Sequence, residues 1–142
     1  MGNYPSILHM QNVAKCLSEK DRKALKVQTR EEAELAYVAK SEKELQRKIE
    51  SLLNRRGYRP IRQRMDRKSN IAEGMPDIQF SCYGQAVYWE IKLPGRNPDP
   101  AQKEQIAALL TAPNSAEVRV IRSYQEAFNH LQELERKYKP KQ

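Results

Sequence analysis

The chain is poor in the residues from which disulfide frameworks and zinc sites are built. It has two cysteines, Cys16 and Cys82, and two histidines, His9 and His130, among 142 residues. Two cysteines are too few for a disulfide framework, and neither has a partner at the spacing of metal-binding motifs. The two histidines lie far apart in the sequence, which argues against a histidine-built zinc site. These absences favour a reduced, intracellular protein.

Long apolar runs are also absent. No stretch approaches the roughly 18 consecutive apolar residues that a membrane helix needs, and the N-terminus lacks the apolar core of a secretory signal. At 142 residues the chain has the length of one domain with a short appendage, which is enough to bury a core. The sequence therefore predicts a folded domain without a membrane partner.

Basic residues, in contrast, are in excess. Lys and Arg number 26 against 18 Asp and Glu, which gives a net charge of +8. Such an excess favours a polyanionic partner, although a merely soluble basic surface gives the same total. Clustering favours nucleic acid, since between residues 54 and 68 the only acid is Asp66. The first basic cluster comprises Arg55, Arg56, Arg59, Arg62, Arg64, Arg67 and Lys68, and the second comprises Arg136, Lys137, Lys139 and Lys141.

Capping signals divide the chain into an N-terminal helical extension, residues 1–40, and a domain, residues 41–142. In the extension, Thr29 precedes "REEAELAYVAK" as a helix cap, and this amphipathic run is a candidate for extra dimer surface. The domain opens with a helix that begins after Ser41, which forms a capping box with Glu44, and ends at Gly57.

The remaining domain alternates strand and helix signals. We expect an edge strand at residues 58–65, strands at 77–82 and 86–93 joined by a short connection at 83–85, and a further strand at 117–122. A helix begins after Asp99 with Pro100 in its first position, and its apolar face is formed by Ile106, Leu109 and Leu110. A last helix follows Ser123, which forms a capping box with Glu126. The predicted order from residue 41 is α-β-β-β-α-β-α.

Two opposite charges interrupt the apolar strand "VYWEIKL", residues 87–93. Because side chains alternate across a strand, Val87, Trp89 and Ile91 share one face, and Tyr88, Glu90 and Lys92 share the other. In the preceding strand, Asp77 begins the face that continues with Gln79 and Ser81. A hairpin pairing therefore predicts Asp77 on the same face as Glu90 and Lys92.

Two interpretations of these charges stay open at the level of the residues. Glu90 and Lys92 can form a partly exposed ion pair while Asp77 caps a turn. Alternatively, two carboxylates beside an ammonium form an oxygen-ligand site for a hard cation, in which the lysine lowers the cost of clustering the acids. The Pro-Asp pair upstream, the apolar strand and the order of elements favour the cation site.

These motifs resemble a known family. Pro76-Asp77 followed by "EIK", residues 90–92, is similar to the signature of the PD-(D/E)XK nuclease superfamily, whose αβββαβ core matches residues 41 to about 122. The series "SEKELQ", "GMPDIQF", "VYWEIKLPG" and "DPAQ" resembles the VRR-NUC branch, which includes small stand-alone phage and bacterial proteins. The resemblance implies an α/β fold, a restriction-endonuclease-like core with a mixed sheet flanked by helices, and a cytoplasmic protein of bacterial or phage origin.

The resemblance also implies roles for individual residues. Asp77 and Glu90 match the family's metal ligands, and Lys92 matches its catalytic lysine. The carbonyl of Ile91 is expected to complete the metal shell. Gln102 matches a glutamine after the third strand, where it would hold the lysine or a phosphate; a solvated helix residue is the alternative.

The family further places a glutamate of the first helix at the metal, and two residues compete for this position. Glu42 lies on the helix face of Leu45 and Ile49, toward the sheet, whereas Glu44 is rotated away and engaged in capping. We therefore expect Glu42 to be the ligand, with Gln46 one turn further as a supporting residue.

Together these features predict an endodeoxyribonuclease that uses Mg²⁺ or Mn²⁺ to hydrolyse DNA phosphodiester bonds. The first basic cluster is expected to bind backbone phosphates. By analogy with small relatives, we expect a homodimer specific for branched DNA such as four-way junctions. Two alternatives stay open: a non-catalytic DNA-binding subunit that keeps the fold, and a nuclease for linear DNA or RNA.

Overall fold

The computed structural model describes Ser18, Lys20 and residues 29–62 and 73–141. The chain divides into two compact units, residues 1–37 and residues 38–142. In the first unit, α3 (Arg30–Leu35) is a short helix whose cap, Thr29, exchanges hydrogen bonds with Glu32 in a capping box. None of the helices in the described ranges is long and apolar enough to cross a membrane.

The second unit is an α/β domain. Its elements are α4 (Glu42–Arg55), β1 (Ile61–Arg62), β2 (Ile78–Cys82), β3 (Gln85–Ile91), α5 (Pro100–Leu110), β4 (Glu117–Ile121) and α6 (Tyr124–Tyr138). This order confirms the predicted α-β-β-β-α-β-α sequence of elements. The expected edge strand is paired at residues 61–62, while residues 63–65 of that prediction lie outside the described ranges.

The four strands form one mixed sheet in the order β1-β2-β3-β4. β1 and β2 pair antiparallel, as do β2 and β3, whereas β3 and β4 are parallel. The parallel pair requires a crossover connection, and α5 is the helix of that crossover. The fold class is therefore α/β, with a mixed sheet flanked by helices.

Helix caps fix the start of all three helices of this domain. Ser41, Asp99 and Ser123 each accept a hydrogen bond from the backbone three residues on. The two predicted Ser-Glu capping boxes are wrong in one detail: the glutamate side chains accept from the residue before the cap. Glu44 Oε2 lies 3.4 Å from the Lys40 nitrogen, and Glu126 Oε2 lies 2.8 Å from the Arg122 nitrogen.

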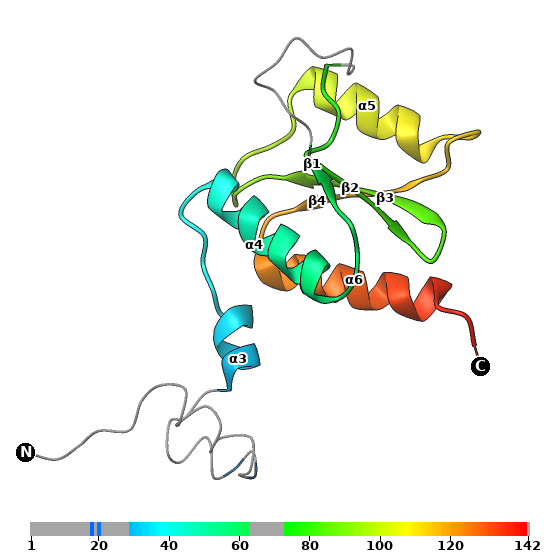
Figure 1. The fold of residues 1–142 in the computed structure, drawn as a ribbon. Helices are drawn as coiled ribbons and strands as arrows, with labels where there is room; N and C mark the ends of the chain where they lie inside the picture. The colour runs from blue at the N-terminus through cyan, green and yellow to red at the C-terminus, as the bar shows by residue number, and fades with distance from the viewer. Residues whose placement is uncertain (1–17, 19, 21–28, 63–72, 142) are drawn as a thin grey trace, which may run out of the picture. The chain divides into compact units, whose positions relative to one another are not determined.

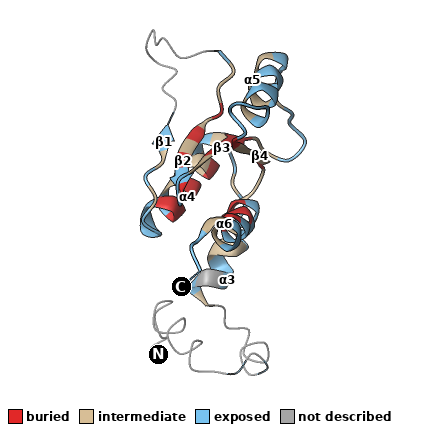
Figure 2. Cartoon of the chain, turned by 90° about the vertical axis from the view of Figure 1, so that its right-hand side faces the viewer, coloured by how far each residue is buried: buried red, intermediate tan, exposed pale blue. Residues whose placement is uncertain are grey.

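The hydrophobic core lies between the sheet and the pair α4–α6. Figure 1 shows α4 and α6 on one face of the sheet and α5 on the other. Buried residues are concentrated on α4, α6, β2 and β3, as the red segments of Figure 2 show. At the centre, the rings of Phe80 and Trp89 meet edge to face with centroids 4.8 Å apart. The indole nitrogen of Trp89 donates to Nδ1 of buried His130 at 2.8 Å.

Helix α5 differs from the prediction. The apolar face expected from Ile106, Leu109 and Leu110 is not part of the core, since no residue of α5 is buried and Leu110 is 52% exposed. The helix covers the sheet face that carries the charged residues, and a polar surface offers little apolar area to bury. Its first turn is nevertheless held in place by contacts with Gly74 and Glu90.

The β2–β3 connection is tighter than predicted. Cys82 pairs with Gln85, so the turn consists of Tyr83 and Gly84 alone. Both have positive φ, 49° and 86°, as a two-residue type I′ hairpin requires. This turn sets the register that decides which residues meet at the other end of the two strands.

Candidate functional site

The hairpin register brings Asp77 and Glu90 together at the end of the sheet away from the turn. Ile78 pairs with Trp89, and continuing this antiparallel register by one residue sets Asp77 opposite Glu90. Directly opposite residues point to the same face of a sheet. The carboxylate of Asp77 is held in place by the backbone, because its Oδ2 accepts a hydrogen bond from the Ile91 nitrogen at 2.8 Å.

Glu90 is a carboxylate almost fully removed from solvent, with 1% of its surface exposed. Its Oε1 accepts a hydrogen bond from Gln102 Nε2 at 2.8 Å and lies 3.6 Å from the ammonium nitrogen of Lys92. Its Oε2 is buried and has no hydrogen-bond partner in the part of the chain that the structure describes. A buried oxygen without a partner is costly, so such an atom marks a place where a ligand is expected.

Burial raises the proton affinity of both carboxylates, and Asp77 raises the pKa of Glu90 further whereas Glu90 lowers the pKa of Asp77. Burial raises the pKa of Glu90 to about 8, the negative charge of Asp77 adds to this rise, and Lys92 opposes it. Burial also raises the pKa of Asp77, against the hydrogen bond from Ile91 and the charge of Lys92. Desolvation and a like charge both disfavour the ionised form. A nearby cation would favour it.

The first turn of α5 holds Gln102 at this cluster. Gln102 and Asp99 form a reciprocal capping box, with both hydrogen bonds at 2.9 Å, so the glutamine side chain both accepts from Asp99 and donates to Glu90. Gly74, in the loop before Asp77, packs against the same turn: a β-carbon at this position would lie 2.5 Å from the carbonyl carbon of Ala101. Its φ of 85° also favours glycine. The "GMPD" loop and α5 therefore fix each other.

Glu42, the first residue of α4, is near the cluster but does not join it. Its negative charge raises the pKa of Asp77, and its Oε1 is buried without a hydrogen-bond partner among the described residues. The nearest cation is the guanidinium of Arg96, 4.0 Å away. Gln46, expected to support Glu42, instead donates to Glu50 at 3.3 Å.

Sequence reasoning missed the loop that follows Lys92 and the residue that holds it. Arg122, just after β4, donates from Nη1 to the carbonyls of Leu93 (3.3 Å) and Arg96, and from Nη2 to Asn97 Oδ1 (3.3 Å). These bonds fix the loop and with it the Arg96 side chain beside Glu42. The sequence signal was the place of Arg96 four residues after Lys92 of the E-x-K motif, and the sequence analysis did not identify Arg122.

The donor chemistry of the cluster fits a hard divalent cation in part. Asp77, Glu90 and Glu42 supply carboxylate oxygens, two of them buried without partners, and such oxygens are what Mg²⁺ and Mn²⁺ prefer. Within the described ranges, however, no group of three or more His, Cys, Asp and Glu side chains stands close enough to hold a metal ion. Two carboxylates meet, and Glu42 lies further off.

The first basic cluster is divided between internal contacts and solvent. Arg55 donates to the Tyr124 hydroxyl at 3.0 Å, Arg56 donates to Glu135 at 2.8 Å, and Arg62 forms a two-point ion pair with Glu50 at 2.9 and 2.5 Å. Arg59 is exposed. The expected phosphate contacts of Arg64, Arg67 and Lys68 lie outside the described residues.

Comparison with known proteins gives no independent assignment of this site. A scan against protein-family models finds no match to the chain, and a search of curated proteins finds none either. Function therefore has to be argued from the residues themselves.

Proposed function

We propose that this protein is a metal-dependent endonuclease that hydrolyses DNA phosphodiester bonds, with a fold and site of the PD-(D/E)XK type and the VRR-NUC branch as its closest pattern. One observation carries the proposal: a buried glutamate, Glu90, lies beside Asp77, with one oxygen bound by Lys92 and Gln102 and the other without a hydrogen-bond partner among the described residues. A merely structural ion pair has no need for a second carboxylate in the same dry place.

The roles of the residues follow from their contacts. Asp77, Glu90 and the carbonyl of Ile91 would hold a Mg²⁺ or Mn²⁺ ion, with Glu42 completing the set. When bound, such an ion lowers the pKa of a bound water and stabilises charge on the phosphoryl oxygen. The hydrogen bonds from Ile91 to Asp77 and from Gln102 to Glu90 orient the two carboxylates. The ammonium of Lys92, only partly exposed at 16%, would orient the attacking water.

A nuclease assay with matched variants tests the proposal. We expect cleavage of a panel of four-way junction, flap, duplex, single-stranded and RNA substrates to require Mg²⁺ or Mn²⁺ and to stop in EDTA. Asp77→Asn should lower cleavage by roughly three orders of magnitude or more, because it removes a ligand of the charge that stabilises the transition state. Glu133→Gln, which removes an exposed carboxylate on α6, is the matched control. Full activity of Asp77→Asn, or activity in EDTA, contradicts the assignment.

The absence of a three-ligand cluster among the described residues favours one second candidate, a non-catalytic DNA-binding subunit. The same panel separates the two functions. A binder shows DNA affinity that is independent of divalent ions and unchanged in Asp77→Asn, with no cleavage of any substrate.

We also propose that the working form is a homodimer acting on branched DNA. One chain carries one candidate site, whereas resolving a junction requires two cuts in opposed strands, and a two-fold dimer supplies two sites in matching symmetry. Light scattering of the full chain at assay concentration tests this. A monomer that still cuts junctions symmetrically contradicts it.

A further inference from the structure

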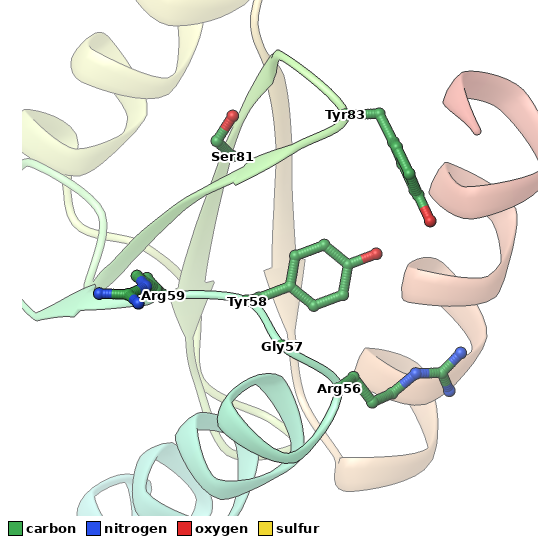
Figure 3. Close-up of a pocket in the computed structure, with 6 residues that line it drawn as sticks. All are labelled: Arg56, Gly57, Tyr58, Arg59, Ser81 and Tyr83. Atoms are coloured by element: carbon green, nitrogen blue, oxygen red, sulfur yellow. The ribbon is translucent and has the colours of Figure 1, made fainter. Parts of the chain in front are cut away.

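A second concave site lies at the opposite end of the sheet, beside the β2–β3 turn. It is a cavity of about 440 Å³ lined by Arg56, Gly57, Tyr58, Arg59, Ser81 and Tyr83. Figure 3 shows the chain from Arg56 to Arg59 on one side and β2 with its turn on the other. Among the described residues, β1 pairs with β2 at residues 61–62, so the chain from Arg56 to Pro60 is not part of the ladder. Before that pairing the two segments diverge, and Pro60 has no backbone N–H to extend the ladder. We call this site the hairpin pocket.

Two aromatic side chains line the hairpin pocket, and they differ in how firmly they are held. Tyr58 packs its ring edge to face against Phe80, with centroids 5.6 Å apart, and its hydroxyl lies 3.7 Å from the sulfur of Cys82. Burial raises the pKa of Tyr58. Tyr83, at the turn, is 49% exposed and makes no ring contact with the residues that the structure describes. The pocket therefore offers one aromatic ring to solvent, carried by the backbone of a type I′ turn.

The two arginines of the hairpin pocket also differ, because one is paired with a carboxylate and the other is exposed. Arg56 is bound to Glu135 and lies over the ring of Phe128 at 5.7 Å. Arg59 is exposed and forms no hydrogen bond or ion pair with the described residues. A neighbouring cavity of about 410 Å³ shares Arg56 and adds Arg136 and Lys139. The fold thus brings the start of the first basic cluster against the second, which are about 80 residues apart in sequence.

We propose that the hairpin pocket binds an unpaired nucleotide of a DNA strand, with the base on the Tyr83 ring and the phosphate on Arg59. The volume is within the range of small-molecule sites. An exposed aromatic ring and a guanidinium without a partner among the described residues line the pocket from opposite sides, as Figure 3 shows, and proteins bind single strands without reading sequence through aromatic stacking combined with basic groups. Fully paired DNA has no free base face to offer, so the pocket would distinguish the unpaired part of a branched substrate. This inference rests on the proposed nuclease function for the identity of the polymer.

The distance between the two sites makes the proposal quantitative. Glu42 and Arg56 flank the two ends of α4, so the candidate active site and the hairpin pocket are separated by about 20 Å along this helix. For a strand that is base-paired between the two sites, with about 3.4 Å per nucleotide, the unpaired nucleotide in the pocket lies about six positions from the bond that is cut.

Binding of a fluorescent oligothymidine in EDTA tests the pocket without any cleavage. We expect Tyr83→Ala to weaken binding by about 5- to 100-fold, as loss of one stacked base does, and Tyr83→Phe to bind as the wild type does. Arg59→Ala should lower the slope of log affinity against log salt by roughly 0.7. Arg47→Ala is the matched control, because Arg47 is an exposed arginine in the middle of α4, outside both cavities.

A duplex of the same length is the second probe, and Tyr83→Ala should leave its affinity unchanged. Equal losses for duplex and single strand, or equal losses in Arg59→Ala and Arg47→Ala, overturn the pocket. So does unchanged single-strand binding in Tyr83→Ala when its thermal unfolding matches that of the wild type. Failure of the nuclease proposal looks different, since it gives Tyr83-dependent binding without cleavage of any substrate.

On a substrate that is cut, 5-iododeoxyuridine placed along the unpaired strand locates the contact. Photo-cross-linking to Tyr83 should peak about six nucleotides from the cleaved bond. A peak at the cleaved bond itself, or cross-links at Tyr83 that do not depend on position, contradicts the assigned site.

Discussion

The two faces of strand β3 are built on opposite principles. On the face toward α4 and α6, Val87, Trp89 and Ile91 are buried, and the polar His130 among them is satisfied by the Trp89 indole. On the face toward α5, Glu90 is buried as deeply, but one of its oxygens has no hydrogen-bond partner within the described ranges. The two faces of one strand therefore contribute differently to stability. Burial of the apolar face stabilises the fold, whereas burial of the Glu90 carboxylate destabilises it.

The difference shows that burial alone does not identify a core residue. Trp89 and Glu90 are both almost fully inaccessible, yet the indole gains free energy from burial whereas the carboxylate loses it. A group that the fold buries at a cost is the better candidate for chemistry. Three measurements probe this contrast, in order of decreasing effect on the free energy of unfolding.

The largest effect is expected from adjacent substitutions on the two faces. Trp89→Ala should lower the unfolding free energy by about 3–5 kcal/mol, because it leaves a large cavity in the core. Glu90→Gln should change it by less than about 1.5 kcal/mol, the net worth of a hydrogen bond, since Gln keeps the shape of the side chain. Urea unfolding followed by circular dichroism, in EDTA, measures both.

If Glu90→Gln lowered the unfolding free energy by several kcal/mol, Glu90 would be a residue that stabilises the fold, as Trp89 does. Glu133→Gln on the surface of α6 is the control for the amide substitution itself.

An intermediate effect is expected from His130, a histidine in the core. Burial lowers the pKa of His130 to about 4 from its ordinary 6.5, so the folded state holds this imidazole neutral. The unfolded chain binds more protons below pH 6.5. The contribution of neutral His130 to the unfolding free energy is therefore fully present above pH 6.5. It is lost as the pH falls toward 4, by about 3 kcal/mol in total.

Comparison with His130→Gln isolates this contribution. The difference in unfolding free energy between the wild type and this variant should shrink as the pH falls from 7 to 4, since Gln does not titrate. The carboxyl of Glu90 titrates in both proteins, so its contribution cancels. A difference that is constant over this range contradicts a neutral, buried His130.

The smallest effect on stability is expected at the first turn of α4. Glu44→Ala should lower the unfolding free energy by about 1 kcal/mol, as loss of a capping partner does, and leave cleavage intact. Glu42→Gln should leave stability almost unchanged and abolish cleavage, because Glu42 Oε1 accepts no hydrogen bond from the described residues and its ion pair with Arg96, at 4.0 Å, is exposed. Paired melting and kinetic measurements distinguish the two, and the reverse pattern would move the site from Glu42 to Glu44.

Local signals account for the parts of the fold that the sequence could predict. Ser41 and Gly57 bound α4 because capping is decided within a few residues. The faces of β3 follow from the period of two along a strand. The pairing of neighbouring strands predicted that Asp77 meets Glu90, but the two-residue turn that sets this register was not predicted, because the expected connection covered residues 83–85.

Contacts between distant segments account for the rest. The apolar residues of α5 do not show by themselves whether their helix face is exposed or packed in the core. Their burial depends on the sheet surface against which the helix lies. Arg122 reaches a loop 25–29 residues earlier in the chain, and Arg62 is held by Glu50 on α4. Such pairings depend on the three-dimensional arrangement, so composition and spacing cannot reveal them.

Because Gly74 lies close to Ala101, the two ends of α5 differ in how well they tolerate substitution. The first turn of α5 is fixed by Gly74 on one side and by the Gln102–Glu90 hydrogen bond on the other. The later turns, up to Leu110, contain no fully buried residue, although Ile106 and Leu109 are half-buried, so their exposed positions are open to exchange. One methyl group at residue 74 would displace Gln102, whereas several substitutions two turns away would leave it in place. The domain can vary the outer end of this helix while the candidate site stays constant.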